Sequence, residues 1–194
     1  LFEEAQKLGV KYFSIWAFST ENWKRDKKEI DAIFNLVLDG IRRLSKKLHE
    51  NHIRIRQIGR RERLPKELAA EFVKFEKETE DYEDFNILLC VDYGGRDEIV
   101  RAANRLLKAE AKNIDEKTFS KFLDTKDIPD PDLIIRTGGE KRLSGFMTFQ
   151  TIYSELYFTD IYFPDFGPEE LKNAIEDFGN RKRRFGGDGD NALG

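Results

Sequence analysis

The sequence predicts an α/β domain with a mostly parallel central sheet flanked by helices. Apolar, strand-like runs alternate along the chain with segments whose apolar residues recur at helical spacing. Polar loops follow several of the strand-like runs, as expected where parallel strands end and ligands collect. We expect one domain over residues 1–187 and a flexible tail over residues 188–194, which are rich in Gly and Asp.

The elements of the first quarter follow in order. The opening LFEEAQKLG is typical of a helix end, with Gly9 in the left-handed conformation that closes many helices. VKYFSIWAF predicts a buried strand, because β-branched and aromatic residues suit a sheet, and the polar loop FSTENWKR follows it. A long helix is expected from Lys27 to about His49, where the apolar residues at helical spacing are Ile30, Ile33, Phe34, Val37, Ile41, Leu44 and Leu48.

Four further strands and three helices are expected downstream. HIRIRQIG, from His52, alternates as a strand with one solvated face, and Pro65 opens a helix at its first turn. FNILLCVDY predicts a strand covered on both faces, and GGRDEIVRAANRLLKA a helix after a tight turn. PDLIIRT and ELYFTDIYF predict two more strands, and PEELKNAIEDFGNRKRR a closing helix.

Composition excludes several classes of protein. The 194 residues carry a formal net charge of -3, which does not suit a general binder of nucleic acid, because such binders need excess positive charge. The single Cys90 excludes an internal disulfide framework and fits a reducing compartment. No apolar run spans a bilayer and no signal-peptide pattern opens the chain, so we expect a cytoplasmic protein. The chain begins in mid-helix without Met, and we expect a segment upstream of Leu1.

The segment RTGGEKRLS, residues 136–144, predicts an anion site at a strand end. Arg136 and Arg142 can bind phosphate in a planar, two-pronged geometry, and Ser144 can add a hydroxyl donor. Gly138 and Gly139 would let the backbone approach the anion. The alternative is an ordinary surface turn with solvated arginines.

The segment FSTENWKR predicts a site that is apolar on one side and anionic on the other. Ser19, Thr20 and Asn22 offer short polar groups, and we expect Trp23 to be exposed beside the cation Arg25. The alternative is capping of the long helix, since Ser, Thr and Asn are common caps, and we expect capping to account for part of the segment.

Two further segments leave a structural and a functional interpretation open. Glu155 lies among aromatic residues in YSELYFTD, so it needs either a basic partner or a divalent cation. In NRKRRFGG, the cations can stabilise a helix C-terminus, or Arg184 and Gly186 can complete a phosphate site.

Five ordered motifs resemble the cis-prenyltransferases, the undecaprenyl diphosphate synthase family. They are FSTENWKR, DYGGRDEI, DLIIRTGGEKRLSGF, YSELYFTD and RRFGG, and the resemblance runs from about Lys7 to Gly187. It implies the fold of that family and the condensation of isopentenyl diphosphate onto an allylic diphosphate, farnesyl or geranylgeranyl, with formation of a cis double bond. Repetition would build a long polyprenyl chain in an apolar tunnel.

The resemblance also implies residue roles. Isopentenyl diphosphate would be held by Arg136, Arg142, Leu143 and Ser144, and Glu155 would share Mg²⁺ with an aspartate of the family's N-terminal phosphate loop. The substrate site would be lined by Ser19, Thr20, Glu21, Trp23 and Arg25. Asn22 matches the family's candidate proton acceptor; since an amide is scarcely basic, we expect it to position or relay while a diphosphate oxygen takes the proton. Arg184 and Gly186 match an element that reaches a neighbouring subunit's site, which implies a homodimer.

The chain also departs from the family pattern. The N-terminal phosphate loop with its catalytic aspartate is not in this sequence, so the chain as given should be inactive or nearly so. Asp92 stands where Asn is common, and the Thr-Gly-Gly-Glu form of residues 137–140 resembles archaeal members. The alternative function is a non-catalytic scaffold subunit, but such subunits tend to lose the substrate arginines and serine, which are present here. A transient membrane contact for product release would suit the lipid product.

Overall fold

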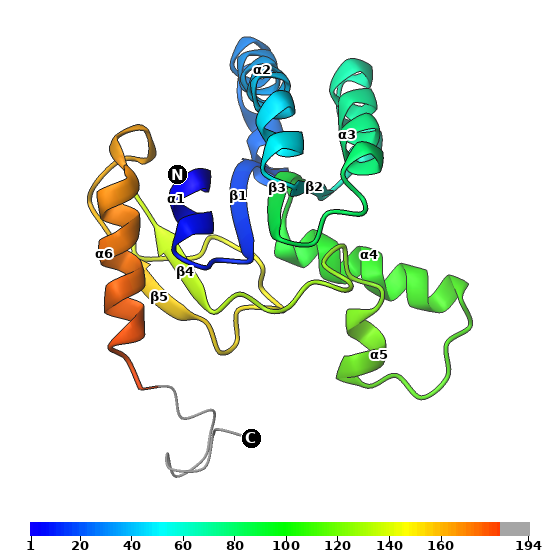
Figure 1. The fold of residues 1–194 in the computed structure, drawn as a ribbon. Coiled ribbons are helices and arrows are strands. Elements are labelled where there is room, and N and C mark those ends of the chain that lie inside the picture. Colours follow the sequence, from blue (N-terminus) through cyan, green and yellow to red (C-terminus); the bar gives the residue numbers. More distant parts are fainter. Residues whose placement is uncertain (183–194) are drawn as a thin grey trace. The chain divides into compact units, whose positions relative to one another are not determined.

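The computed structural model describes residues 1–182 and shows the predicted alternation of strands and helices (Figure 1). The chain forms two compact units, one of Gly9–Ile128 and one of Leu1–Leu8 with the chain from Pro129 onward. The expectation of one domain over residues 1–187 stays a prediction, and the tail over 188–194 lies outside the described residues.

The elements have the following bounds. The α-helices are α1 (Phe2–Lys7), α2 (Lys27–Glu50), α3 (Lys66–Glu78), α4 (Gly95–Lys108), α5 (Glu116–Ser120) and α6 (Pro168–Gly179). The strands are β1 (Tyr12–Ser19), β2 (Ile53–Ile58), β3 (Phe85–Tyr93), β4 (Leu133–Arg136) and β5 (Glu155–Phe158). Short 3₁₀ helices are η1 (Thr20–Lys24), η2 (Arg61–Arg63) and η3 (Phe163–Asp165).

The unit Gly9–Ile128 is built on a three-stranded parallel sheet in the order β1-β3-β2. All nine residues of the central strand β3 are buried, as its nearly continuous apolar sequence predicts. Because the three strands are parallel, their carboxyl ends at Ser19, Ile58 and Tyr93 meet at one edge of the sheet. The loops that carry candidate site residues of this unit start there.

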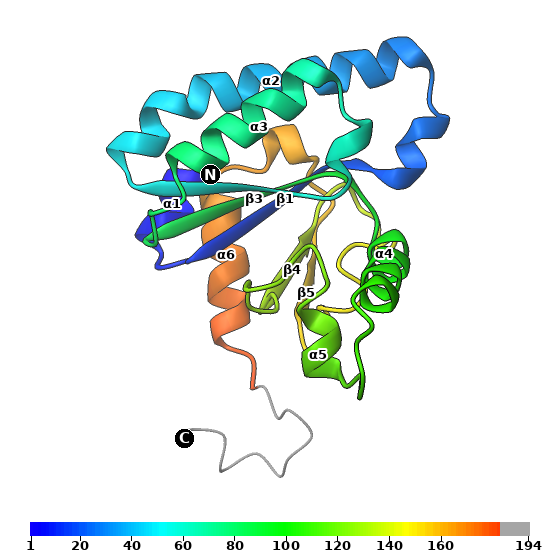
Figure 2. The same cartoon turned by 90° about the vertical axis from the view of Figure 1, so that its right-hand side faces the viewer.

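Helices α2 and α3 pack on each other and cover one face of this sheet (Figure 2). Phe34 and Ile41 of α2 and Phe72 and Phe75 of α3 are buried against it. Burial of a side chain of this size contributes about 1.5–3 kcal/mol. The long helix predicted from Lys27 is therefore confirmed. Within its predicted apolar stripe the buried residues are Ile30, Phe34, Ile41 and Leu48, and the half-buried ones are Ile33, Val37 and Leu44.

Helix α3 also closes the free edge of β2. The backbone N–H of Ile55 donates to Thr79 Oγ1 at 3.1 Å, and that of Gln57 to Glu76 Oε1 at 2.7 Å. An open edge with free N–H groups could pair with another chain, so these side chains protect the sheet from misassembly.

The second unit contains β4 and β5, which pair in parallel with Arg136 opposite Phe158. Helix α6 packs against β5, and α1 against α6. Helix α1 ends as predicted. Leu8 is its cap residue, and Gly9, which follows, has φ +80°.

Some boundaries differ from those expected. Helix α6 ends at Gly179 with Asn180 as its cap, so Arg181 and Lys182 follow the helix; Gly favours such a stop. Pro65 is the N-cap of α3, one residue before the expected position, and α5 was not predicted because it has five residues. Every strand pair is parallel, as predicted, in groups of three and two strands. Among the described residues, no helix combines the length and the apolar character needed to cross a membrane.

Candidate functional site

The loop after β1 contains six of the predicted site residues and folds into the 3₁₀ helix η1. The Ser19 N–H donates to Asn22 Oδ1 at 2.8 Å, and the Arg25 N–H donates to the Asn22 carbonyl at 3.0 Å. Asp26 then caps α2, accepting from the Lys28 N–H at 2.9 Å. Capping by this segment therefore serves η1, through Ser19 and Asn22, whereas the cap of the long helix is Asp26, just beyond the segment in which it was expected.

Thr20 lies against the turn before α4 and Arg25 pairs with a residue of α2, whereas Glu21 is exposed. A Cβ placed on Gly94, just before α4, would lie 2.3 Å from Thr20 Oγ1, so the missing side chain of Gly94 makes room for the threonine. Arg25 is exposed and pairs with Glu29 one turn along α2. The loop after β1 is thereby in contact with the starts of α2 and α4.

The surroundings of Trp23 differ from the predicted exposed position beside Arg25. The indole is half-buried, with Phe18 and Phe34 at ring-centroid distances of 5.4 and 5.6 Å. Its Nε1–H donates to Asp92 Oδ1 at 2.8 Å, and the cation over its ring is Arg63. Sequence reasoning missed Arg63. Its only indication of an unusual feature at position 92 was that Asp stands where Asn is common in the family.

A buried polar network lies behind this loop. Glu98 is fully buried and accepts from the Tyr93 hydroxyl at 2.7 Å and from the Asp124 N–H at 2.9 Å. Asp97 pairs with Arg60 and Arg101. Burial raises the pKa of Asp97, but hydrogen bonds from these arginines outweigh it and leave the pKa below its ordinary value. The network holds the turn from β3 into α4 rigidly.

Arg136 ends β4, and its guanidinium lacks one partner. Its Nε is buried, and no described residue accepts a hydrogen bond from it. A buried donor without an acceptor costs free energy, more when it is charged. An anion is the ligand that such a group would bind.

The two glycines after Arg136 do not serve the anion as predicted. The Gly138 N–H donates to the Ile161 carbonyl and the Gly139 N–H to the Thr159 carbonyl, both at 2.9 Å. Their φ values of +81° and +76° explain the need for glycine. The prediction that their backbone approaches an anion was wrong, because both amides continue the pairing between the two strands.

The other members of the predicted anion site follow in the same loop. Arg142 and Ser144 are exposed and Leu143 is half-buried. Arg142 pairs with Glu140, and Ser144 has φ +51°. The three lie on a solvent-accessible loop, so their groups can reorganise around a ligand.

Glu155 at the start of β5 has a basic partner. Arg181 Nη1 donates to Glu155 Oε2 at 2.9 Å and also to the Leu156 carbonyl, while Nη2 binds Asp177. The hydrogen bond with Glu155 raises the pKa of Arg181, outweighing desolvation, which lowers it. Glu155 therefore has a basic partner, which the sequence did not single out, and its role toward a metal stays a prediction.

Magnesium would fit this position only with help from a ligand. Mg²⁺ is usually held by one or two carboxylates together with substrate phosphates and water. Glu155 offers one partly exposed carboxylate, and within residues 1–182 no group of three or more His, Cys, Asp or Glu is arranged for a metal. The described residues therefore fit an ion shared with a phosphorylated substrate.

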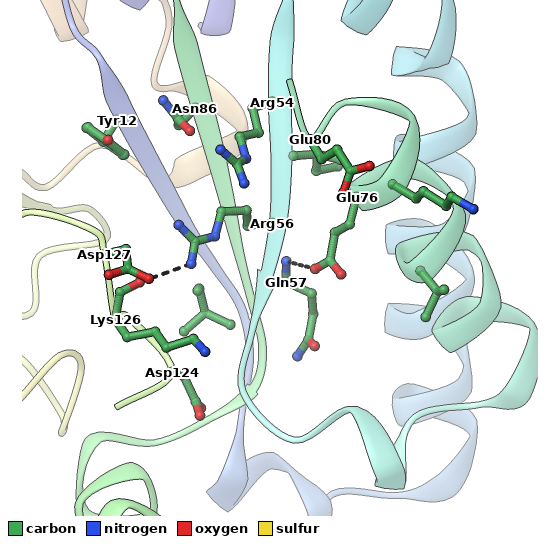
Figure 3. A pocket seen from close by; sticks show the side chains of 14 residues that line it. Tyr12, Arg54, Arg56, Gln57, Glu76, Glu80, Asn86, Asp124, Lys126 and Asp127 are labelled. Carbon is green, nitrogen blue, oxygen red and sulfur yellow. Dashed lines mark hydrogen bonds between the residues drawn. The ribbon is translucent and has the colours of Figure 1, made fainter. Parts of the chain in front are cut away.

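A cavity of about 580 Å³ lies elsewhere in the unit Gly9–Ile128 (Figure 3). Arg54 and Arg56 project into it from β2, near Tyr12 and Asn86 at the amino ends of β1 and β3. Its lining contains none of the predicted site residues, so the cavity is not part of the candidate site.

Comparison with known proteins decides the family. Residues 1–186 match the family model described as "Putative undecaprenyl diphosphate synthase". The chain belongs to this family of isoprenyl transferases. An isoprenyl transferase of Aquifex aeolicus is 45% identical over 186 residues, which cover 96% of this chain and 80% of the relative. One of Fusobacterium nucleatum is 44% identical over 95% of this chain and 80% of the relative.

Two solved structures share the fold of this family member. A probable undecaprenyl diphosphate synthase of Campylobacter jejuni has a TM-score of 0.87 at 37% identity, covering 95% of this chain and 87% of that one. Lavandulyl diphosphate synthase of Lavandula x intermedia, in complex with dimethylallyl diphosphate, has a TM-score of 0.90 at 36% identity, covering 95% and 82%. The predicted fold and family are confirmed. The roles of the site residues and the archaeal likeness stay predictions, and Arg184 and Gly186 lie outside the described residues.

Proposed function

We propose that this family member condenses isopentenyl diphosphate onto an allylic diphosphate, repeatedly and with a cis double bond at each addition, to make a long-chain polyprenyl diphosphate. The observation that carries the proposal is the buried Nε of Arg136, which has no acceptor among the described residues at the carboxyl end of β4. A diphosphate oxygen would satisfy that donor. The allylic diphosphate held by the lavandulyl synthase supports the same substrate class here.

The reaction asks the protein to stabilise a departing diphosphate. The carbon–oxygen bond of the allylic substrate breaks, a carbon–carbon bond to the isopentenyl unit forms, and a proton leaves the new chain. Charge develops on the diphosphate, and preorganised cations and donors lower the barrier most when aimed at such charge. Arg136, Arg142, Leu143 and Ser144 would bind the isopentenyl diphosphate, and Ser19, Thr20, Glu21, Trp23 and Arg25 would line the substrate site. Glu155 would hold Mg²⁺ together with a diphosphate, and the ion would neutralise charge on the phosphate oxygens.

Asn22 positions groups in this proposal and does not act as the base. Its Oδ1 already accepts from the Ser19 N–H, and an amide takes up a proton poorly. A diphosphate oxygen receives the proton, as in our sequence interpretation. We also propose a homodimer, on the resemblance of Arg184 and Gly186 to an element that reaches a neighbouring subunit.

The test is incorporation of labelled isopentenyl diphosphate by the full-length protein. Dimethylallyl, farnesyl and geranylgeranyl diphosphates are offered separately, with Mg²⁺ and with chelator, and the products are sized. Chelator-sensitive chain growth supports the proposal and identifies the primer and product length. A folded protein that incorporates nothing would refute it and favour the scaffold subunit.

Arg136→Met sharpens this test, with Lys141→Met as the matched control from the same loop. Loss of charge-assisted hydrogen bonds of about 1.5–3 kcal/mol should lower kcat/KM for isopentenyl diphosphate by roughly 10- to 100-fold. Lys141 is exposed, and we expect its replacement to leave kcat/KM within about twofold. Equal losses in the two variants would show that the loop needs only positive charge.

A further inference from the structure

The side chain of Asp92 is fully buried at the end of β3 and is surrounded by donors. Oδ1 accepts from Trp23 Nε1 at 2.8 Å and from Arg63 Nη2 at 2.5 Å, and Oδ2 accepts from Arg63 Nε at 2.6 Å. A buried carboxylate is tolerated only with a cation and good hydrogen bonds. The buried charge of Asp92 is therefore stabilised by both Trp23 and Arg63. The position of Asp92 in turn fixes the positions of both partners.

Arg63 reaches Asp92 from the 3₁₀ helix η2, which follows β2. Two of its nitrogens meet the two oxygens of Asp92 in the planar, two-pronged geometry that guanidinium favours. The guanidinium carbon lies 5.6 Å from the centre of the Trp23 ring, within the range of a cation–π contact. Arg63 thus contacts both the acceptor of the indole N–H and the face of the indole.

The backbone keeps these groups in place. Asp92 has φ +53°, a left-handed conformation in which Asp and Asn are the favoured non-glycine residues. Its carbonyl accepts from the Arg60 N–H at 3.0 Å, and a Cβ on Gly59 would lie 2.8 Å from that carbonyl oxygen. The ends of β2 and β3 are therefore locked together beneath Trp23.

Trp23 is fixed on its remaining sides by apolar contacts. Phe18 of β1 and Phe34 of α2 pack on the indole, so its position joins the loop after β1 to the long helix. With its only polar hydrogen donated to Asp92, the indole has no donor left for a diphosphate. Its role in the loop is that of a fixed apolar wall.

We propose that Asp92 and Arg63 are positioning residues that set the indole of Trp23, and through it the substrate loop Ser19–Arg25. This inference rests on the proposed function of that loop. Because a misplacement of about 1 Å can cost about 10²-fold in rate, loosening the indole should affect turnover more than isopentenyl diphosphate binding, whose proposed residues lie elsewhere in the chain.

Two variants loosen the indole in different ways. Asp92→Gly keeps the tolerance of φ > 0 and removes both carboxylate oxygens, so that Trp23 loses its acceptor and Arg63 loses its ion pair. Arg63→Met removes the cation while retaining apolar contact. Arg61→Met is the matched control, since Arg61 lies in the same 3₁₀ helix but binds Gln57 and Glu76.

The first readout is the fluorescence of Trp23, measured in a Trp16→Phe background because the chain has two tryptophans. Emission should move to longer wavelength and acrylamide quenching should increase in both Asp92→Gly and Arg63→Met, but not in Arg61→Met. Unchanged emission and quenching in folded variants would overturn the proposal. This readout needs no turnover, so it remains decisive even if the protein proves to have no prenyltransferase activity.

The second readout is a double-mutant cycle in the full-length protein. Asp92→Gly should lower kcat by about 10-fold or more with KM for isopentenyl diphosphate within about twofold. In a Trp23→Phe background the same substitution should have little further effect, because its influence passes through the indole. Equal effects in both backgrounds would show that Asp92 acts by another route and would overturn the proposal. Absence of activity in the unsubstituted protein would instead contradict the proposed function.

Discussion

Replacing Tyr93 with Phe isolates one buried hydrogen bond. Tyr93 is fully buried and donates its hydroxyl to Glu98 Oε2 at 2.7 Å, and Glu98 is itself 0% exposed. Phe keeps the ring, so the change removes the hydroxyl alone. Since a hydrogen bond to a charged group contributes about 1.5–3 kcal/mol, we expect the free energy of unfolding to fall by about 2 kcal/mol at pH 7.

The deficit should shrink at alkaline pH. Burial, and after it the charge of Glu98, raises the pKa of Tyr93 well above its ordinary value, whereas the phenol of the unfolded chain ionises near pH 10. Below that pH both states hold the proton and the contribution is fully present. Above it only the unfolded state releases the proton, so the stability of the unsubstituted protein falls by about 1.4 kcal/mol per pH unit from this group. The Phe variant has no such proton to lose.

Urea unfolding at pH 7, 9, 10 and 11 measures both effects. Tryptophan fluorescence suits the measurement, because Trp16 and Trp23 both lie in the unit Gly9–Ile128. A deficit at pH 7 below about 0.5 kcal/mol, the range of ordinary surface substitutions, would refute the reasoning about the hydrogen bond. A deficit that stays constant from pH 9 to 11 would refute the reasoning about the proton.

Two further predictions concern Cys90 and two glycines. Burial raises the pKa of the Cys90 thiol, so a thiol reagent such as DTNB should label the folded protein slowly and the urea-unfolded protein at once; rapid labelling of the folded protein would contradict its burial. At Gly59, with φ +121°, a Cβ would lie 2.4 Å from the Val91 carbonyl oxygen, so Gly59→Ala should lower the free energy of unfolding by more than about 2 kcal/mol. Gly40→Ala, in open space on α2, should raise it by up to about 1 kcal/mol, and a similar loss in both variants by urea unfolding would count against this account.

The elements that sequence predicted well are those whose signal is local and long. Helix α2 begins at Lys27 as expected because its apolar spacing continues from Ile30 to Leu48, and β3 is buried because its sequence is almost continuously apolar. The short helix α5 and the end of α6 at Gly179 were missed, since five residues carry little periodicity and a basic run resembles a continuing helix.

The candidate site was predicted in part for the same reason. The motifs located the loops after β1 and β4, but the cap of the long helix is Asp26, just beyond the segment in which the cap was expected. The role given to Gly138 and Gly139 was wrong, because the sequence does not show that their amides bind the carbonyls of Ile161 and Thr159. The exposure expected for Trp23 was wrong too, since its neighbours Asp92 and Arg63 come from β3 and η2, which lie far along the chain.

The sequence by itself determined the order and type of the main elements and the family to which the chain belongs, because periodicity and motif order are properties of neighbouring residues. Only the tertiary structure decided which charges meet. Trp23 and Asp92 are 69 residues apart in the chain, and Arg181 and Glu155 are 26 apart. Such pairs form only when the fold brings different elements together, and most buried carboxylates and N–H groups find their partners in this way.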